Sequence, residues 1–483
     1  MKSGRWLYAG AVVVALVIGL GLWNPIHVKA DRDYVPKFRV DASWPKELPA
    51  PVGYNPLTWP TPTSGDTEAH RWVQGEVAGS CTDQWDNIYT FNRAWETGVT
   101  VNGVLQGNES GAIDSNDATP AGAKPSPPVV VFNSDGKTIA GFGNPALQQT
   151  GPEYGYPVYL PHGAHGCYID YQGNLWVGGN GDGVVQKYNP KAAAAAGASA
   201  TYITQIGTHG VCDGPITGTN TYTSCSETTS TNSSHTLLSE PPDIAVDPLP
   251  DPVTGTRGTV YIADGYGNHR VVVFTTTDGI NYTYNRQFGT DCGHNETPNG
   301  TPTVSNPCPD GAFGHTGGGH PHCVILANDG LVYACDRPNS RIQVWTKTGT
   351  FVRNIRVNNF PNTSAAKAQA ILSAANRACD MDFYPNVDYL AGKSPTNQKY
   401  IIDVDLQSDN GYVLDRSTGE ALRALGRCGI APCPGHNAGE FAYSHTMNVD
   451  SQGSVYVAET ITGRRIQKFV RVDDDDHDRH DHH

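Results

Sequence analysis

The sequence predicts an all-β fold: a six-bladed β-propeller with an N-terminal signal or anchor segment and a disordered acidic, histidine-rich C-terminal tail. Two observations predict the propeller. Turn residues are abundant, with 54 glycines and 34 prolines among 483 residues, and a unit of short strands recurs six times along the chain. The chain is too apolar for a disordered protein and has too few helix-forming residues for a helical bundle.

The recurring unit consists of a short strand, a polar turn, an aromatic-valine strand, a polar loop and a further strand. Its apolar positions alternate, which is typical of a small antiparallel sheet. Two degenerate copies lie around residues 77–132 and 379–425. Four clear copies begin at His165, Pro242, His322 and His445. Six such sheets arranged radially form a propeller, which protects strand edges without a helical layer.

Ring closure and domain boundaries follow from the last copy. It ends near Val472, one strand short, and Lys37–Val40 alternates correctly to supply the missing outermost strand. The predicted organisation is therefore residues 1–30 as a signal peptide or membrane anchor, 31–472 as the propeller, and 473–483 as the tail. The remaining segments are read as loop insertions at 102–126 and 209–236 and a helix over 363–378.

The N-terminus indicates export. An uncharged run, Trp6–Trp23, follows Lys2 and Arg5, and Val28-Lys29-Ala30 fits a cleavage site. Eighteen apolar residues lie between the length of a signal-peptide core and that of a spanning helix. We therefore expect an extracytoplasmic protein, periplasmic or secreted, which residues 6–23 tether to the membrane if they are retained.

Cysteine usage agrees with export, because the chain has 11 cysteines and several lie close together in loops. Three local disulfides are predicted, Cys212/Cys225, Cys292/Cys308 and Cys428/Cys433. Cys323 and Cys335 face each other across one hairpin, which favours a disulfide over a thiolate ligand. The sequence does not settle the pairing of the remaining cysteines, and the odd total leaves at least one thiol free.

Charge excludes one class of partner. The formal net charge of −14 argues against a nucleic-acid-binding protein, which would present a basic face. The tail, DDDDHDRHDHH from Asp473 to His483, is disordered by composition. It is either a solvated tail or a weak ligand for divalent metal through its four histidines.

Three histidines occupy one register of the repeat. His165, His322 and His445 each lie 11 residues before the second-strand aromatic residue of their own unit. These units are the second, fourth and sixth, and the innermost strands of a propeller line its channel, so the three imidazoles should converge on one axis. Three imidazoles with an open fourth position form the ligand set of a catalytic zinc site, although another divalent metal would suit the same ligands.

Other candidate residues come from the ends of the second strands. Arg93 and Arg337 each lie four residues past the second-strand aromatic residue, and Tyr266 lies five past. In a hairpin the end of the second strand lies beside the start of the first, so these residues should share the mouth with the histidines. Arginine suits a carboxylate, and a phenol beside a metal can act as an acid or base.

These motifs resemble NHL-repeat propellers, and within them peptidyl-α-hydroxyglycine α-amidating lyase, which cleaves a hydroxyglycine-extended peptide to a peptide amide and glyoxylate. The resemblance covers most of residues 70–470. It is carried by LPHGAHGCYIDYQGNLWV, ADGYGNHRVVVF, HPHCVILANDGLVYACDRPNSRIQVW and SHTMNVDSQGSVYV. It implies His165, His322 and His445 as zinc ligands. It also implies Tyr266 as the catalytic phenol, Arg337 as a substrate-binding residue, and Arg93 at the remaining arginine position.

The chain departs from that family at one metal position. An aspartate associated with structural calcium follows the family's third histidine, whereas Thr446 follows His445 here, which weighs against calcium. Three further histidines near the site are read as loop residues rather than supporting groups: His162, His315 and His320. Asp264 and Asp336 are expected to brace loops between strands.

Two classes of function remain. The first is a zinc-dependent carbon–nitrogen lyase, or a hydrolase using the same metal, acting on a small carboxylate-bearing or peptide substrate. The second is a non-enzymatic exported propeller that binds protein or glycan partners. Fold alone does not choose between them, because propellers host many functions.

Overall fold

The structure of the chain is a computed structural model. It describes residues 35–48, 72–93, 100–101, 104–105, 124–142, 160–161, 163–190, 200–213, 232–292, 308–314, 320–357, 360, 364, 377–385 and 397–472. The chain divides into two compact units, Met1–Pro36 and Lys37–His483. Every element named below belongs to the second unit.

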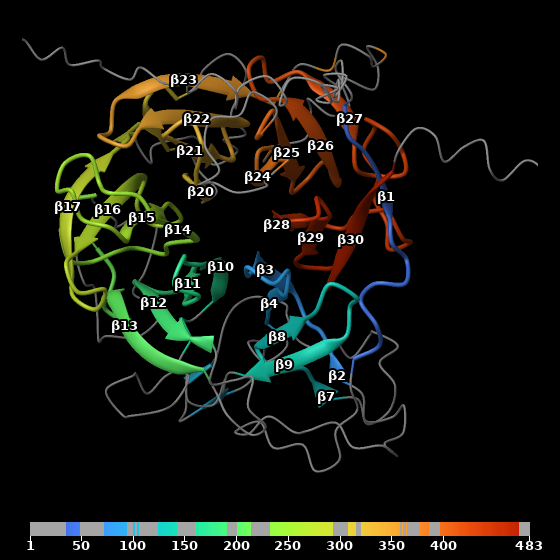
Figure 1. Ribbon diagram of the computed structural model, residues 1–483, viewed down its shortest axis with the longest axis horizontal. Coiled ribbons are helices and arrows are strands. Elements are labelled where there is room, and N and C mark those ends of the chain that lie inside the picture. Colours follow the sequence, from blue (N-terminus) through green and yellow to red (C-terminus); the bar gives the residue numbers. More distant parts are fainter. Residues whose placement is uncertain are drawn as a thin grey trace, which may run out of the picture. The chain divides into compact units, whose positions relative to one another are not determined.

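Six four-stranded antiparallel sheets are arranged around a central channel, which confirms the predicted six-bladed β-propeller (Figure 1). Among the described residues every regular element is a strand and no helix occurs. Strands β3, β10, β14, β20, β24 and β28 lie nearest the channel, and successive strands of each blade lead outward. The first residues of six inner strands are thereby brought close to one axis.

Blades 1 to 3 follow one another in sequence. Blade 1 contains β3 (Val77–Thr82), β4 (Ile88–Asn92), β8 (Val129–Phe132) and β9 (Thr138–Phe142). Blade 2 contains β10 (Ala164–Ile169), β11 (Leu175–Gly179), β12 (Val184–Asn189) and β13 (Thr201–Gly207). Blade 3 contains β14 (Asp243–Asp247), β15 (Thr259–Asp264), β16 (Arg270–Thr276) and β17 (Tyr282–Phe288).

Blades 4 to 6 complete the ring. Blade 4 contains β20 (Cys323–Leu326), β21 (Leu331–Asp336), β22 (Arg341–Thr346) and β23 (Phe351–Arg356). Blade 5 contains β24 (Asp380–Tyr384), β25 (Tyr400–Asp405), β26 (Asn410–Asp415) and β27 (Ala421–Ala424). Blade 6 contains β28 (Ser444–Val449), β29 (Val455–Glu459), β30 (Arg465–Val472) and β1 (Lys37–Val40).

Three short strand pairs lie outside the blades. Two are parallel, β2 (Trp72–Val73) with β7 (Lys124–Pro125) and β18 (Thr290–Asp291) with β19 (Ala312–Phe313). One is antiparallel, β5 (Thr100–Val101) with β6 (Val104–Leu105).

A turn motif in the sequence builds the first hairpin of several blades. Asp170 accepts hydrogen bonds from the backbone N–H groups of Gln172 and Asn174, and its second oxygen accepts from the indole N–H of Trp176. Asp450 repeats this arrangement with the Tyr456 hydroxyl. One carboxylate thus closes the turn and fixes the aromatic ring of the second strand. These rings are fully buried between neighbouring sheets, where the hydrophobic core lies.

The ring closes as the alternation of Lys37–Val40 predicts. Strand β1 pairs antiparallel with β30, with Lys37 opposite Val472 and Val40 opposite Phe469. The chain then inserts Trp44 between blades 6 and 1, where its ring lies 4.9 Å from that of Tyr456. The N-terminal arm therefore joins the last blade to the first.

The disulfides agree with the predicted pairs where these can be compared. Cys292–Cys308, Cys323–Cys335 and Cys428–Cys433 are bonded as predicted. A fourth disulfide, Cys81–Cys167, joins the inner strands of blades 1 and 2. Cys212 is disulfide-bonded, and its predicted partner Cys225 lies outside the described residues. Cys379 is a free, buried thiol, and this set of disulfides fits an oxidising, extracytoplasmic compartment.

Several predictions concern segments outside the described residues. These are the signal or anchor segment 1–30, most of the insertion at 102–126, most of the helix predicted over 363–378, and the tail 473–483. Within the described part of the chain, no helix has the length and apolar character needed to cross a membrane.

Removing the closing arm should destabilise the propeller. A chain beginning at Pro45 loses strand β1 and the buried Trp44, so an edge strand and its apolar face become exposed. Loss of a buried tryptophan alone typically costs about 3–5 kcal/mol. We expect urea denaturation to show a fall in unfolding free energy of at least that size. A chain beginning at Val35 is the control and should keep its stability; equal stability of the two chains would contradict the closure.

Candidate metal centre

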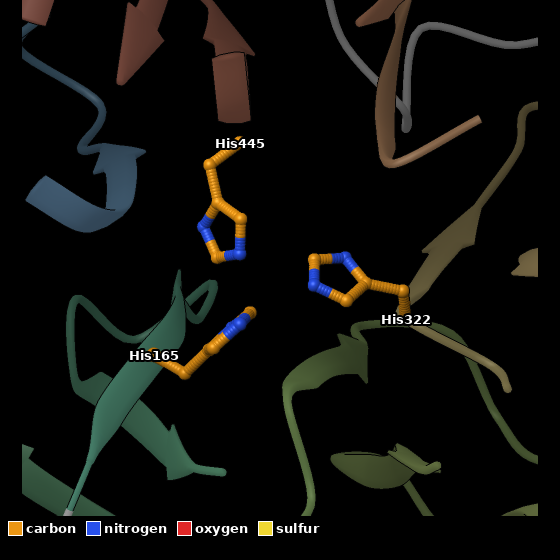
Figure 2. A group of neighbouring side chains, drawn as sticks. All are labelled: His165, His322 and His445. Atoms are coloured by element: carbon orange, nitrogen blue, oxygen red, sulfur yellow. The ribbon is translucent and has the colours of Figure 1, made fainter. Parts of the chain in front are cut away.

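Three histidines meet in the channel, each at the start of an inner strand. His165 is the second residue of β10, His322 immediately precedes β20, and His445 is the second residue of β28. One ligand nitrogen from each lies within 4.8 Å of the other two. Their ring centroids are 4.5–4.9 Å apart, and the three rings point toward one another (Figure 2). The register of the repeats therefore predicts their convergence correctly.

A backbone carbonyl of the next blade fixes each imidazole. The Nδ1 atom of His165 lies 3.0 Å from Pro242 O, that of His322 lies 2.6 Å from Cys379 O, and that of His445 lies 2.8 Å from Ala78 O. A carbonyl oxygen only accepts hydrogen bonds, so each Nδ1 carries the proton and donates it. The Nε2 atoms keep their lone pairs, which is the tautomer of a histidine that binds metal through Nε2.

Burial keeps the three imidazoles neutral. It lowers the pKa of His165 well below the usual range, and the neighbouring His445 and His322 lower it further. The pKa of His322 is likewise lowered well below that range by burial and then by Arg337. Burial, Arg337 and Arg93 lower the pKa of His445 to about 3. Three neutral nitrogen ligands suit zinc or a related divalent metal.

Tyr266 lies directly against the histidines. Its hydroxyl oxygen is 3.1 Å from Nε2 of His322 and 3.4 Å from Nε2 of His165. The tyrosine follows β15 in a loop that passes very close to residues 320–321. A Cβ atom on Gly265 would lie 1.8 Å from the Pro321 carbonyl oxygen, so only glycine fits there and the phenol is held over the channel.

Arg337 reaches the same phenol from blade 4. Its Nη1 donates to the Tyr266 hydroxyl at 3.1 Å, and its guanidinium carbon lies 5.3 Å from the centre of the tyrosine ring. The residue before it, Asp336, accepts hydrogen bonds from Asn339 and Arg341. Asp264 makes the matching contacts in blade 3, so both aspartates brace loops as the sequence predicts.

Arg93 hydrogen-bonds to the backbone that leads into His165. Its guanidinium is buried and faces protein acceptors: Nε donates to Ala164 O, and Nη2 donates to Gly163 O and to the Asn180 side chain. A buried guanidinium needs such partners. Arg93 therefore holds the backbone that leads into His165, which is a positioning contact.

Two further expectations can be compared with the structure. His320 is not a plain loop histidine: it is fully buried, and its Nδ1 lies 3.1 Å from Asp336 Oδ1, so the interpretation of this residue was wrong. His162 and His315 lie outside the described residues. A second possible ligand group, Cys323, Cys335 and Asp380, offers no thiolate because its cysteines form a disulfide.

The channel continues as a cavity lined by the residues that follow the histidines. Its volume is about 380 Å³, and its walls include Gly166, Val324 and Thr446 together with Asp243 and Asp380. Burial raises the pKa of Asp243 to about 7. Three inner strands thus carry an imidazole at or next to their first residue, and two others, β14 and β24, begin with a carboxyl group.

Comparisons with known proteins add no argument about activity. No protein-family model matches the chain. A streptogramin B lyase structure is 10% identical with a TM-score of 0.37, covering 83% of this chain and 94% of that one. Virginiamycin B lyase from Staphylococcus aureus is 11% identical with a TM-score of 0.36, and the match covers 83% of this chain and 96% of that one. A protein of unknown function from Bacteroides thetaiotaomicron is 13% identical with a TM-score of 0.45, and the match covers 88% of this chain and 75% of that one. At these identities and TM-scores, fold and site rest on the chain's own residues, which define a six-bladed propeller with a three-histidine channel site.

The protein should bind one divalent metal ion at this site. Elemental analysis of a chain lacking Asp473–His483 should find about one ion, most readily zinc, per chain. The tail is removed because its histidines could bind metal independently. A triple alanine variant at His165, His322 and His445 should lose the ion, and unchanged metal content in that variant would refute the site.

The apoprotein should lose stability in mild acid. The folded-state pKa values of the three histidines lie below the unfolded value of 6.5. Below about pH 6.5 the unfolded chain therefore binds protons that the folded chain does not, and stability falls by up to about 1.4 kcal/mol per pH unit for each imidazole. Urea denaturation with chelator at pH 7.5 and 5.0 measures this loss. A triple glutamine variant should show a shallower dependence; identical slopes would contradict the assignment.

Proposed function

We propose that the protein is an exported, metal-dependent carbon–nitrogen lyase of the peptidyl-α-hydroxyglycine α-amidating type. The observation that carries the proposal is the contact of Tyr266 with two of three converging imidazoles and with Arg337. These residues are the ones that the resemblance to the lyase family assigns to metal, proton transfer and substrate. Their arrangement suits a small substrate that carries both a hydroxyl and a carboxylate.

The donor set fits the metal that the proposal requires. His165, His322 and His445 would hold it through their Nε2 atoms, since each Nδ1 is occupied by a carbonyl. A bound divalent metal supplies charge that polarises a substrate oxygen and lowers the pKa of its hydroxyl. The rigid carbonyl contacts keep the three rings aimed at one point.

Tyr266 is proposed to move the proton. In its ionised form the phenol takes the proton of the substrate hydroxyl, and the carbinol oxygen then forms the carbonyl of glyoxylate as the C–N bond breaks. The bonding pair stays on nitrogen, which receives the proton from Tyr266 to give the amide. Arg337 donates a hydrogen bond to the phenol oxygen, so it would keep the Tyr266 hydroxyl in place while the proton moves.

Arg337 is proposed to bind the substrate carboxylate. A guanidinium presents several N–H groups in one plane, and one of them already donates to Tyr266. A carboxylate bound on the neighbouring N–H groups would lie beside the phenol and the histidines. Arg93 contributes indirectly through the Gly163 and Ala164 carbonyls before His165. The compartment fits: we place the protein outside the cytoplasm, with residues 6–23 as a tether if retained.

Replacing Tyr266 with phenylalanine should abolish most activity without changing the fold. The variant lacks the only phenol that contacts the histidines among the described residues, and acid–base groups are typically worth about 100- to 10,000-fold in rate. Glyoxylate release from α-hydroxyhippurate or a hydroxyglycine-extended peptide measures kcat. Metal content and urea denaturation should match the wild type.

The Arg337→Ala variant provides the contrast in the same assay, because loss of carboxylate binding should raise KM more than it lowers kcat. Chelator should stop release by the wild-type protein, and added zinc should restore it. If fully metal-loaded wild-type protein releases no glyoxylate, the lyase proposal fails and a binding function for the propeller gains ground.

A further inference from the structure

Cys379 contacts both His322 and Arg337. It is fully buried directly before β24, the inner strand of blade 5, and its thiol is free. Its carbonyl accepts from Nδ1 of His322, and its sulfur lies 3.8 Å from that same nitrogen. The sulfur also accepts a hydrogen bond from Arg337. One residue thus contacts a candidate metal ligand with its backbone and the candidate carboxylate ligand with its side chain.

The other blades show that the carbonyl and the sulfur of Cys379 have separate roles. Pro242 and Ala78 supply the carbonyls that accept from His165 and His445. Neither of their side chains has a heteroatom, so fixing an imidazole needs only the backbone. The sulfur of Cys379 is therefore not required for His322, and its contact with Arg337 stands as a separate feature.

The orientation of Arg337 needs such a contact. An arginine side chain has several rotatable bonds, and fixing them costs conformational entropy. The hydrogen bond to Tyr266 fixes one edge of the guanidinium, and the sulfur fixes it from blade 5. A sulfur atom is a weak acceptor, so it orients the group without the ion pair that a carboxylate side chain would form.

We propose that the Cys379 sulfur is a positioning group that holds Arg337 ready to bind a substrate carboxylate. This inference rests on the function proposed above, because it takes the ligand of Arg337 from that proposal. A guanidinium that is already oriented pays less entropy when the carboxylate binds, so affinity rises without any new contact to the substrate.

Two measurements on the zinc-loaded full chain test the proposal. In protein labelled with ¹⁵N-arginine, the guanidinium N–H signals of Arg337, assigned with an Arg337→Lys variant, should exchange with water several-fold faster in Cys379→Ala. Calorimetric titration with glyoxylate as the carboxylate probe should show Kd raised about five- to tenfold, which lies within the usual range for the loss of one ordinary hydrogen bond. Zinc content should stay unchanged, because the Cys379 carbonyl remains.

Two matched variants make the result specific. Cys379→Ser retains an acceptor and should restore Kd to within about twofold of the wild type. Val404→Ala removes buried atoms beside Cys379, whose N–H donates to the Val404 carbonyl, and should change neither measurement. Wild-type exchange and Kd in Cys379→Ala would overturn the proposal. If the wild type binds no glyoxylate while exchange still rises in Cys379→Ala, the positioning contact stands and the lyase function fails.

Discussion

The rest of the structure depends on the hydrogen bonds between the inner strands of neighbouring blades, here called joints. A ligand in the channel needs groups from several blades held at fixed distances, and these contacts hold them. Two kinds of hydrogen bond alternate around the ring. The histidine joints run from Nδ1 of one blade to a carbonyl of the next. In the aspartate joints, the backbone N–H of Val324 donates to Asp243 and that of Met447 donates to Asp380. The same contacts therefore close the ring and set the tautomer of each imidazole.

The joint between blades 1 and 2 is made differently. Gly79 approaches the backbone of His165 so closely that a Cβ atom would lie 1.8 Å from its carbonyl oxygen, which leaves no space for an aspartate side chain. The disulfide Cys81–Cys167 joins these two inner strands covalently instead. Arg93 adds hydrogen bonds across the same joint. The strand that carries His165 is thus fixed by a close backbone approach, a covalent bond and a buried guanidinium.

Sequence periodicity predicts the features that repeat from blade to blade, but it does not predict contacts between residues of different blades. Blade number, the closing strand β1 and the convergence of the three histidines follow from strand alternation and from a shared spacing to the buried aromatics. The carbonyls that fix the imidazoles leave no trace in the sequence, because every residue has one. The pairing of Cys81 with Cys167 spans 86 positions and depends on which blades are neighbours. The environment of Arg93 depends on a loop of the next blade, and spacing within one repeat does not show which groups that loop offers.

The site combines three symmetry-related histidines with polar groups that lie on one side of the channel only. The three histidines come from blades 2, 4 and 6 and repeat one local arrangement, which suits a metal ion because its ligands are alike. Tyr266 and Arg337 come from blades 3 and 4, and Cys379 from blade 5, so the groups that contact one another above His322 lie on one side of the axis. On the opposite side the corresponding guanidinium, that of Arg93, is turned to protein acceptors. A symmetric scaffold thereby carries an asymmetric set of polar groups, as the proposed substrate with its hydroxyl and carboxylate on one carbon would require.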